Sequence, residues 1–132
     1  MIIKFITVYI LLVALDFVWI SFVANKKYKK ELGHMLMTDE SGKMKVRYLP
    51  TAILYVFLTI LIMLTTLPFF EFGINFVNTG YAFMMGVLLY GFYEFTNWAI
   101  LKDWPRGVIL VDVLWGGVIV SVASVVASLI VF

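Results

Sequence analysis

Long apolar runs dominate the chain and predict membrane-spanning helices. They cover about residues 2–23, 48–70, 80–101 and 105–132. Each is close to or above the roughly 20 residues that a helix needs to cross a bilayer. None shows the ten-residue alternating pattern that is typical of membrane barrel strands. The pattern therefore predicts one all-α domain over residues 1–132, a polytopic membrane protein with four transmembrane helices in a bundle.

The one long polar stretch, residues 24–47, is predicted to contain a short helix. Tyr28, Leu32, Met35 and Leu36 recur with the spacing of a single apolar helix face. Lysines surround this face, which is typical of helices that lie on a membrane surface. We therefore expect a short interfacial helix in the first loop.

Two shorter connections join the remaining apolar runs. Residues 71–79 connect the second run to the third, and residues 102–105 connect the third to the fourth. In the second of these connections, Asp103 is a candidate N-cap of the last helix, with Pro105 in its first turn.

Composition supports the membrane and excludes several classes of protein. Hydrophobic residues make up 64% of the chain and charged residues 14%, against about 45–50% and about 25% in soluble domains. A soluble nucleotide-binding or nucleic-acid-binding domain is therefore excluded, and the lipid bilayer is the expected partner. The chain has no cysteine, which excludes disulfides and thiolate chemistry.

The distribution of charge predicts the orientation. Nine of the ten basic residues lie in the 24–47 loop or beside the 102–105 turn, and only Lys4 lies at the other end of the spans. The excess of basic residues marks the cytoplasmic side of a membrane protein. We therefore expect the 24–47 loop in the cytoplasm and both termini outside.

Three carboxylates lie inside the predicted spans, where a charged residue costs about 2.5–3.5 kcal/mol on insertion scales. Asp16, Glu94 and Asp112 each lie about seven residues from the cytoplasmic end of a span, hence roughly 10 Å below the surface. Tyr55 falls at the same level. Buried acids usually face the interior of a bundle and find partners there. We therefore predict a polar pocket in the cytoplasmic leaflet.

Aromatic and amide side chains accompany these acids. Trp19 and Trp115 each follow an aspartate by three residues, so that each tryptophan shares a helix face with its acid. Tyr90 and Asn97 share a face with Glu94, and Tyr93 flanks it. The residues predicted to bind a ligand are therefore Asp16, Trp19, Tyr55, Tyr90, Tyr93, Glu94, Asn97, Asp112 and Trp115. Small residues that would let helices approach closely around them are Gly86, Gly91, Gly116 and Gly117.

Three functions fit such a pocket. It could bind or translocate a small ligand, a proton or a cation, and transport through so small a chain would imply at least a homodimer. It could belong to a membrane enzyme or accessory protein that acts on a lipid or isoprenoid, although no nucleophile motif is present. It could also be a purely structural polar network. The sequence identifies no cofactor, metal or catalytic residue.

The order of these motifs resembles a known family. The order runs Leu15-Asp16-Phe17-Val18-Trp19, Tyr28, Leu32-Gly33-His34, Tyr90-Gly91-Phe92-Tyr93-Glu94-Phe95-Thr96-Asn97, Trp104-Pro105 and Val111-Asp112-Val113-Leu114-Trp115-Gly116. Over nearly the whole chain it resembles the bacterial family of predicted membrane proteins called DUF2177. The resemblance implies a four-span protein of the bacterial inner membrane and no particular reaction. It also implies that His34, otherwise expected to be an exposed interfacial residue, belongs to the same site as the acids.

Overall fold

The chain is almost entirely helical in a computed structural model that describes residues 1–132. Its long helices are α1 (Ile2–Val18), α3 (Tyr48–Thr65), α4 (Phe76–Ile100) and α5 (Arg106–Val131). Shorter elements are the π-helical turn η1 (Trp19–Val23), α2 (Asn25–Leu32) and the 3-10 helix η2 (Leu67–Phe72). The only extended pairing is one isolated bridge, so the predicted all-α class is confirmed.

Three helical stretches are long and apolar enough to cross a membrane: Ile2–Val23, Tyr48–Thr65 and Arg106–Val131. α4 is also long enough, but its asparagines and Glu94 make it less apolar than the other three. The structure therefore supports a membrane protein with three candidate spans, and the fourth predicted span is not among them.

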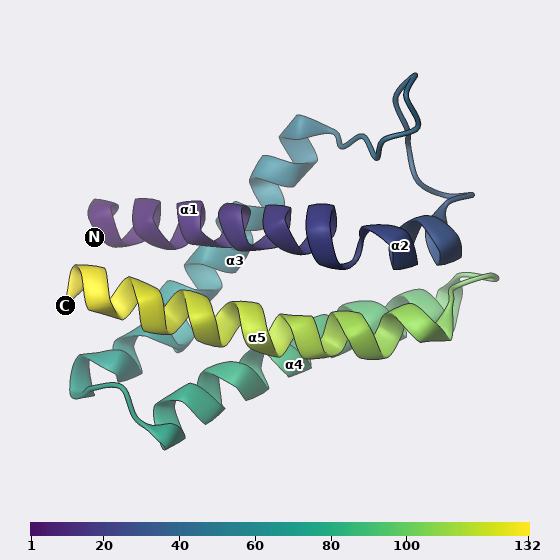
Figure 1. The fold of residues 1–132 in the computed structure, drawn as a ribbon. Helices are drawn as coiled ribbons and strands as arrows, with labels where there is room; N and C mark the ends of the chain where they lie inside the picture. Colours follow the sequence, from purple (N-terminus) through teal and green to yellow (C-terminus); the bar gives the residue numbers. More distant parts are fainter.

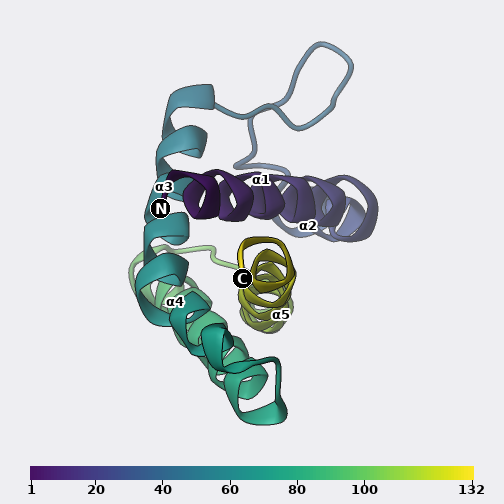
Figure 2. The same ribbon diagram turned by 90° about the vertical axis from the view of Figure 1, so that its left-hand side faces the viewer.

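α5 lies at the centre of the fold. It packs along α4 on one side and against α1 on the other, and α1 also packs across α3 (Figure 1). Figure 2 views α1 and α5 nearly end-on but shows α3 along its length, so α3 is steeply inclined to both. Leu67 and Phe70 of η2 are buried in the core, and η2 packs against α5. The helices thus form a layer of α1, α5 and α4 crossed by α3, rather than the regular bundle that the sequence predicts.

The two termini lie together at one end of the molecule, whereas the 24–47 loop and the turn between α4 and α5 lie at the other (Figure 1). At the end that holds the termini, Lys4 of α1 contacts both η2 and the C-terminal residue. Its ammonium is 3.6 Å from a Glu71 carboxylate oxygen and 4.1 Å from the centre of the Phe132 ring. These contacts therefore hold the two ends of the chain close together.

Glycines bring α4 and α5 into close contact. A Cβ atom at Gly86 would stand 2.0 Å from the Gly116 carbonyl oxygen, and one at Gly116 would stand 2.4 Å from the Tyr90 ring. Gly117 likewise faces the Phe83 ring. Gly91 does not serve this purpose, because a Cβ there would meet no atom within 4 Å. The prediction is therefore right for three of the four glycines and wrong for Gly91.

Helix boundaries differ from the predicted spans where a proline or a capping asparagine ends or begins a helix. α3 ends at Thr65 rather than near residue 70 because Pro68 lies in the first turn of η2 and cannot continue an α-helix. α4 begins at Phe76, since the Asn75 side chain accepts a hydrogen bond from the Asn78 backbone and caps the helix. Asp103 caps nothing. The residue before α5 is Pro105, without a side-chain cap.

The short helix expected in the first loop is present as α2, and it continues the direction of α1 after the π-helical turn η1 (Figure 1). Tyr28 and Leu32 point toward the interior, whereas Met35 is exposed in the turn beyond the helix. α2 packs against the start of α5, where the Glu31 carboxylate lies against Gly107. This packing brings a loop residue, Tyr28, next to the acids.

Candidate functional site

Asp16 of α1 connects three helices through its two carboxylate oxygens. The Tyr55 hydroxyl of α3 donates a hydrogen bond to Oδ2 at 2.7 Å. The Trp115 indole of α5 donates to Oδ1, also at 2.7 Å. Asp16 is only partly exposed, and both of its oxygens are satisfied by aromatic donors. The depth argument predicts that Asp16 and Tyr55 lie at one level, and in the structure they are directly hydrogen-bonded. Trp115, predicted beside Asp112, donates to Asp16 instead.

Asp112 of α5 accepts its hydrogen bond from α2, which lies in the loop between the first two predicted spans. Its Oδ1 accepts a short hydrogen bond from the Tyr28 hydroxyl of α2. The Trp19 indole donates to the same hydroxyl at 3.2 Å, and the Trp19 and Trp115 rings stack with centroids 4.5 Å apart. Burial, reinforced by the hydrogen bond to Asp112, raises the pKa of Tyr28 above its usual value. Tyr28 therefore stays protonated and remains a donor.

Glu94 of α4 is the most deeply buried of the acids, with none of its surface exposed. Its Oε2 accepts a hydrogen bond of 2.8 Å from the Trp104 indole, in the turn after α4. Its Oε1 is buried and has no hydrogen-bond partner. The Asp112 carboxyl interacts with that of Glu94 and also with that of Asp16. We call Asp16, Glu94 and Asp112 the acidic cluster.

The remaining predicted residues divide into two groups. Tyr90 lies against Gly116 and within the electrostatic influence of Asp16 and Asp112. Tyr93 is half-exposed and meets the Trp104 ring edge-on at 6.4 Å. Asn97 is partly buried beside Tyr93. His34, in contrast, is exposed in the turn after α2 and makes no hydrogen bond or ion pair with the acids. The structure therefore does not bring His34 to the cluster.

Sequence reasoning missed two members of the site, Tyr28 and Trp104. The spacing argument assigns Tyr28 to the apolar face of an interfacial helix, and Trp104 enters only as part of the family motif. Both carry a polar atom that needs a partner when buried, and both lie within about ten residues of a cluster acid or its tryptophan. The need of each buried aromatic N–H or O–H group for an acceptor was the signal in the sequence that pointed to these two residues.

No basic side chain neutralises the acidic cluster. The two ion pairs of the chain are Lys4 with Glu71 and Lys27 with Glu31, both outside the cluster. No group of three histidine, cysteine, aspartate or glutamate side chains is arranged to hold a metal ion. The cluster thus combines three acids with neutral tyrosine and tryptophan donors only.

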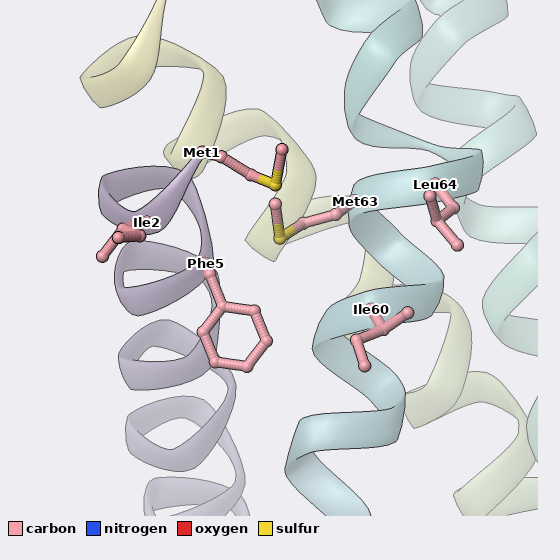
Figure 3. Close-up of a pocket in the computed structure, with 6 residues that line it drawn as sticks. All are labelled: Met1, Ile2, Phe5, Ile60, Met63 and Leu64. Carbon is pink, nitrogen blue, oxygen red and sulfur yellow. The ribbon is translucent and has the colours of Figure 1, made fainter.

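Two grooves on the surface are lined by residues outside the acidic cluster. One has a volume of about 310 Å³ and is lined by Met1, Ile2, Phe5, Ile60, Met63 and Leu64, all of which are hydrophobic (Figure 3). The second has a volume of about 270 Å³ and is lined by Phe95, Trp98, Arg106, Ile109, Leu110 and Val113. None of the residues that line these two grooves belongs to the acidic cluster.

Comparison with known proteins gives one match. The profile of a family described as "Predicted membrane protein (DUF2177)" matches residues 1–129. Neither the curated proteins nor the solved structures contain a match.

Proposed function

The chain belongs to the DUF2177 family of predicted membrane proteins, and from this premise we propose that it is a four-span carrier of the bacterial inner membrane. In this proposal the acidic cluster exchanges protons for a small cation. α4 is the fourth span. Its 25 residues extend about 38 Å, enough for the roughly 30 Å core of a bilayer, and it packs along α5.

The observation that carries the proposal is the absence of any positive charge beside the acidic cluster. Burying an ionised carboxylate without a counter-charge is expensive in a low-dielectric interior. A bound proton or cation removes that cost. Glu94 has the strongest need for one, because it is fully buried and its Oε1 has no hydrogen-bond partner.

A proton shared by Glu94 and Asp112 fits these side chains better than a chelated metal. The two carboxyls interact with each other, and no three-ligand metal group is present. When two carboxylates share a site, repulsion favours protonation of one of them. A small monovalent or organic cation would then compete with the proton for the same negative charge, and the stacked Trp19 and Trp115 rings beside Asp16 and Asp112 offer aromatic faces to it.

The test is proton flux in proteoliposomes that contain a pH-sensitive dye. Outward gradients of Na⁺, K⁺ and methylammonium are imposed in turn. With at least one of them, wild type should acidify the lumen faster than protein-free vesicles do, because each cation that leaves is exchanged for a proton that enters. Asp112→Asn keeps an oxygen that can accept from Tyr28 but removes the exchangeable charge, so its flux should fall to that of protein-free vesicles. Glu40→Gln, in the exposed loop, removes one acid elsewhere and should keep the wild-type rate. Equal rates in the two variants would contradict the proposal.

A structural role is the second candidate, and the satisfied state of Asp16 favours it. Both Asp16 oxygens accept hydrogen bonds from other helices. If the cluster only fixes helix packing, Asp16→Asn and Asp112→Asn should lower thermal stability while no variant and no wild-type sample gives cation-dependent flux. Flux in wild type excludes this alternative.

A further inference from the structure

The groove at the junction of α4 and α5 has one charge at its mouth. Its lining residues belong to the end of α4 and the first turns of α5. The turn that connects these two helices lies at the end of the molecule opposite the termini (Figure 1). Five of its six lining residues are hydrophobic, and the sixth is Arg106. We call it the Arg106 groove.

Arg106 is free to bind an anion. It forms no ion pair with any carboxylate of the chain. Its guanidinium instead lies over the Trp98 ring, 5.3 Å from the ring centre, which holds it beside the groove. A guanidinium presents paired N–H donors that match the geometry of a phosphate.

We propose that the Arg106 groove binds an anionic phospholipid, with the phosphate on Arg106 and an acyl chain in the cleft between α4 and α5. The apolar lining selects a hydrocarbon chain, since a polar occupant would leave its hydrogen bonds unsatisfied there. The guanidinium favours a headgroup with a net negative charge, because the ammonium of a zwitterionic headgroup offsets the charge of its phosphate. The site does not involve the acidic cluster. The proposal is the same whichever leaflet of the membrane contains the turn.

The other groove is a natural contrast. Figure 3 shows its six hydrophobic side chains between the start of α1 and the end of α3, with Met1 and Met63 facing each other. No charged side chain lines it, although its volume is similar. It should accept acyl chains without preference for a headgroup, so headgroup selectivity is specific to the Arg106 groove.

The experiment measures lipids that remain bound after purification. The full chain is reconstituted in vesicles with equal phosphatidylcholine and phosphatidylglycerol, extracted in mild detergent and examined by native mass spectrometry. Wild type should retain phosphatidylglycerol preferentially. Arg106→Gln should reduce that preference about ten-fold, as expected for loss of a charge-assisted hydrogen bond, and Arg106→Lys should restore part of it. Arg47→Gln, which removes the same charge from an exposed position, should keep it.

Two further measurements separate the groove from general charge attraction. Leu110→Trp fills the groove but leaves Arg106 in place, so phosphatidylglycerol retention should fall. Inorganic phosphate in excess should not displace the bound lipid. The proposal is overturned if Arg47→Gln and Arg106→Gln act alike, if Leu110→Trp has no effect, or if inorganic phosphate releases the lipid.

Discussion

At the scale of single residues, the site depends on hydroxyl and indole donors as much as on the acids. Trp115 donates to the aspartate of α1, and Trp19 reaches the aspartate of α5 through the Tyr28 hydroxyl. The two aspartate–tryptophan pairs, each three residues apart in sequence, therefore interlock across helices. Spacing predicts that each tryptophan lies near its own acid, but it cannot show that the hydrogen bonds run to the other pair.

Tyr28 tests this interlocking arrangement. Tyr28→Phe removes only the hydroxyl that donates to Asp112 and accepts from Trp19. Two polar groups then lose a partner in a half-buried place, so we expect a loss of about 1–3 kcal/mol in the free energy of unfolding. Thermal or denaturant unfolding in detergent measures it. Tyr48→Phe, at a hydroxyl that is largely exposed, is the control, and equal stability of the two variants would contradict the network.

The acids themselves were predictable, whereas their partners were only partly so. Asp16, Glu94 and Asp112 are conspicuous because charged residues are rare in apolar runs. Trp104 and Tyr28 are not conspicuous, since aromatic residues are common at the edges of spans. Their roles depend on how the turn after α4 and the helix α2 fold back onto the core, which no local pattern specifies.

At the scale of elements, hydropathy predicts where a helix is apolar but not where its backbone ends. The span predicted over residues 2–23 matches α1 and η1 together. The second predicted span extends past the end of α3, because the apolar Leu67, Phe69 and Phe70 continue the hydropathy pattern although Pro68 ends the α-helix. The third predicted span begins later than α4, because Asn75 and Asn78 are polar although together they form the helix cap.

The α4–α5 contact gives a prediction about two glycines of one helix. Alanine is a better helix former than glycine by about 1 kcal/mol, so Gly91→Ala, which meets no atom within 4 Å, should be neutral or stabilising. Gly86→Ala gains the same propensity but pushes a Cβ atom to 2.0 Å from a backbone oxygen of α5. The helices must separate, at a cost of about 1–3 kcal/mol.

The measurement for this pair is the midpoint of thermal unfolding in the same detergent. Gly86→Ala should unfold at a lower temperature than wild type, and Gly91→Ala should not. If Gly86→Ala were as stable as Gly91→Ala, α4 and α5 could not be packed as closely as the structure places them.

At the scale of the whole molecule, the crossing of α3 is the feature that sequence reasoning could not provide. An apolar helix buried in lipid carries little information about which neighbour it selects, because every face is apolar. Particular contacts fix the position of α3. Among them are the Tyr55 hydrogen bond to Asp16 and, just after the end of α3, the 2.8 Å contact between the Thr66 and Ser124 hydroxyls. These contacts join residues 39 and 58 positions apart in sequence.

The number of spans and the side of the termini form one prediction, because each determines the other. Three spans would leave the N- and C-termini on opposite sides of the membrane, whereas four spans leave them on the same side. The termini lie at one end of the fold, and nine of the ten basic residues lie toward the other end (Figure 1). By the positive-inside rule, both termini should therefore be outside the cytoplasm.

Alkaline phosphatase should be active when fused to either terminus, and green fluorescent protein should be dark there. A fluorescent protein inserted at Ser41 in the basic loop should be bright, which provides the control for expression. Activity of the phosphatase at only one terminus would mean that α4 does not cross the membrane, and a fluorescent reporter at both termini would reverse the orientation.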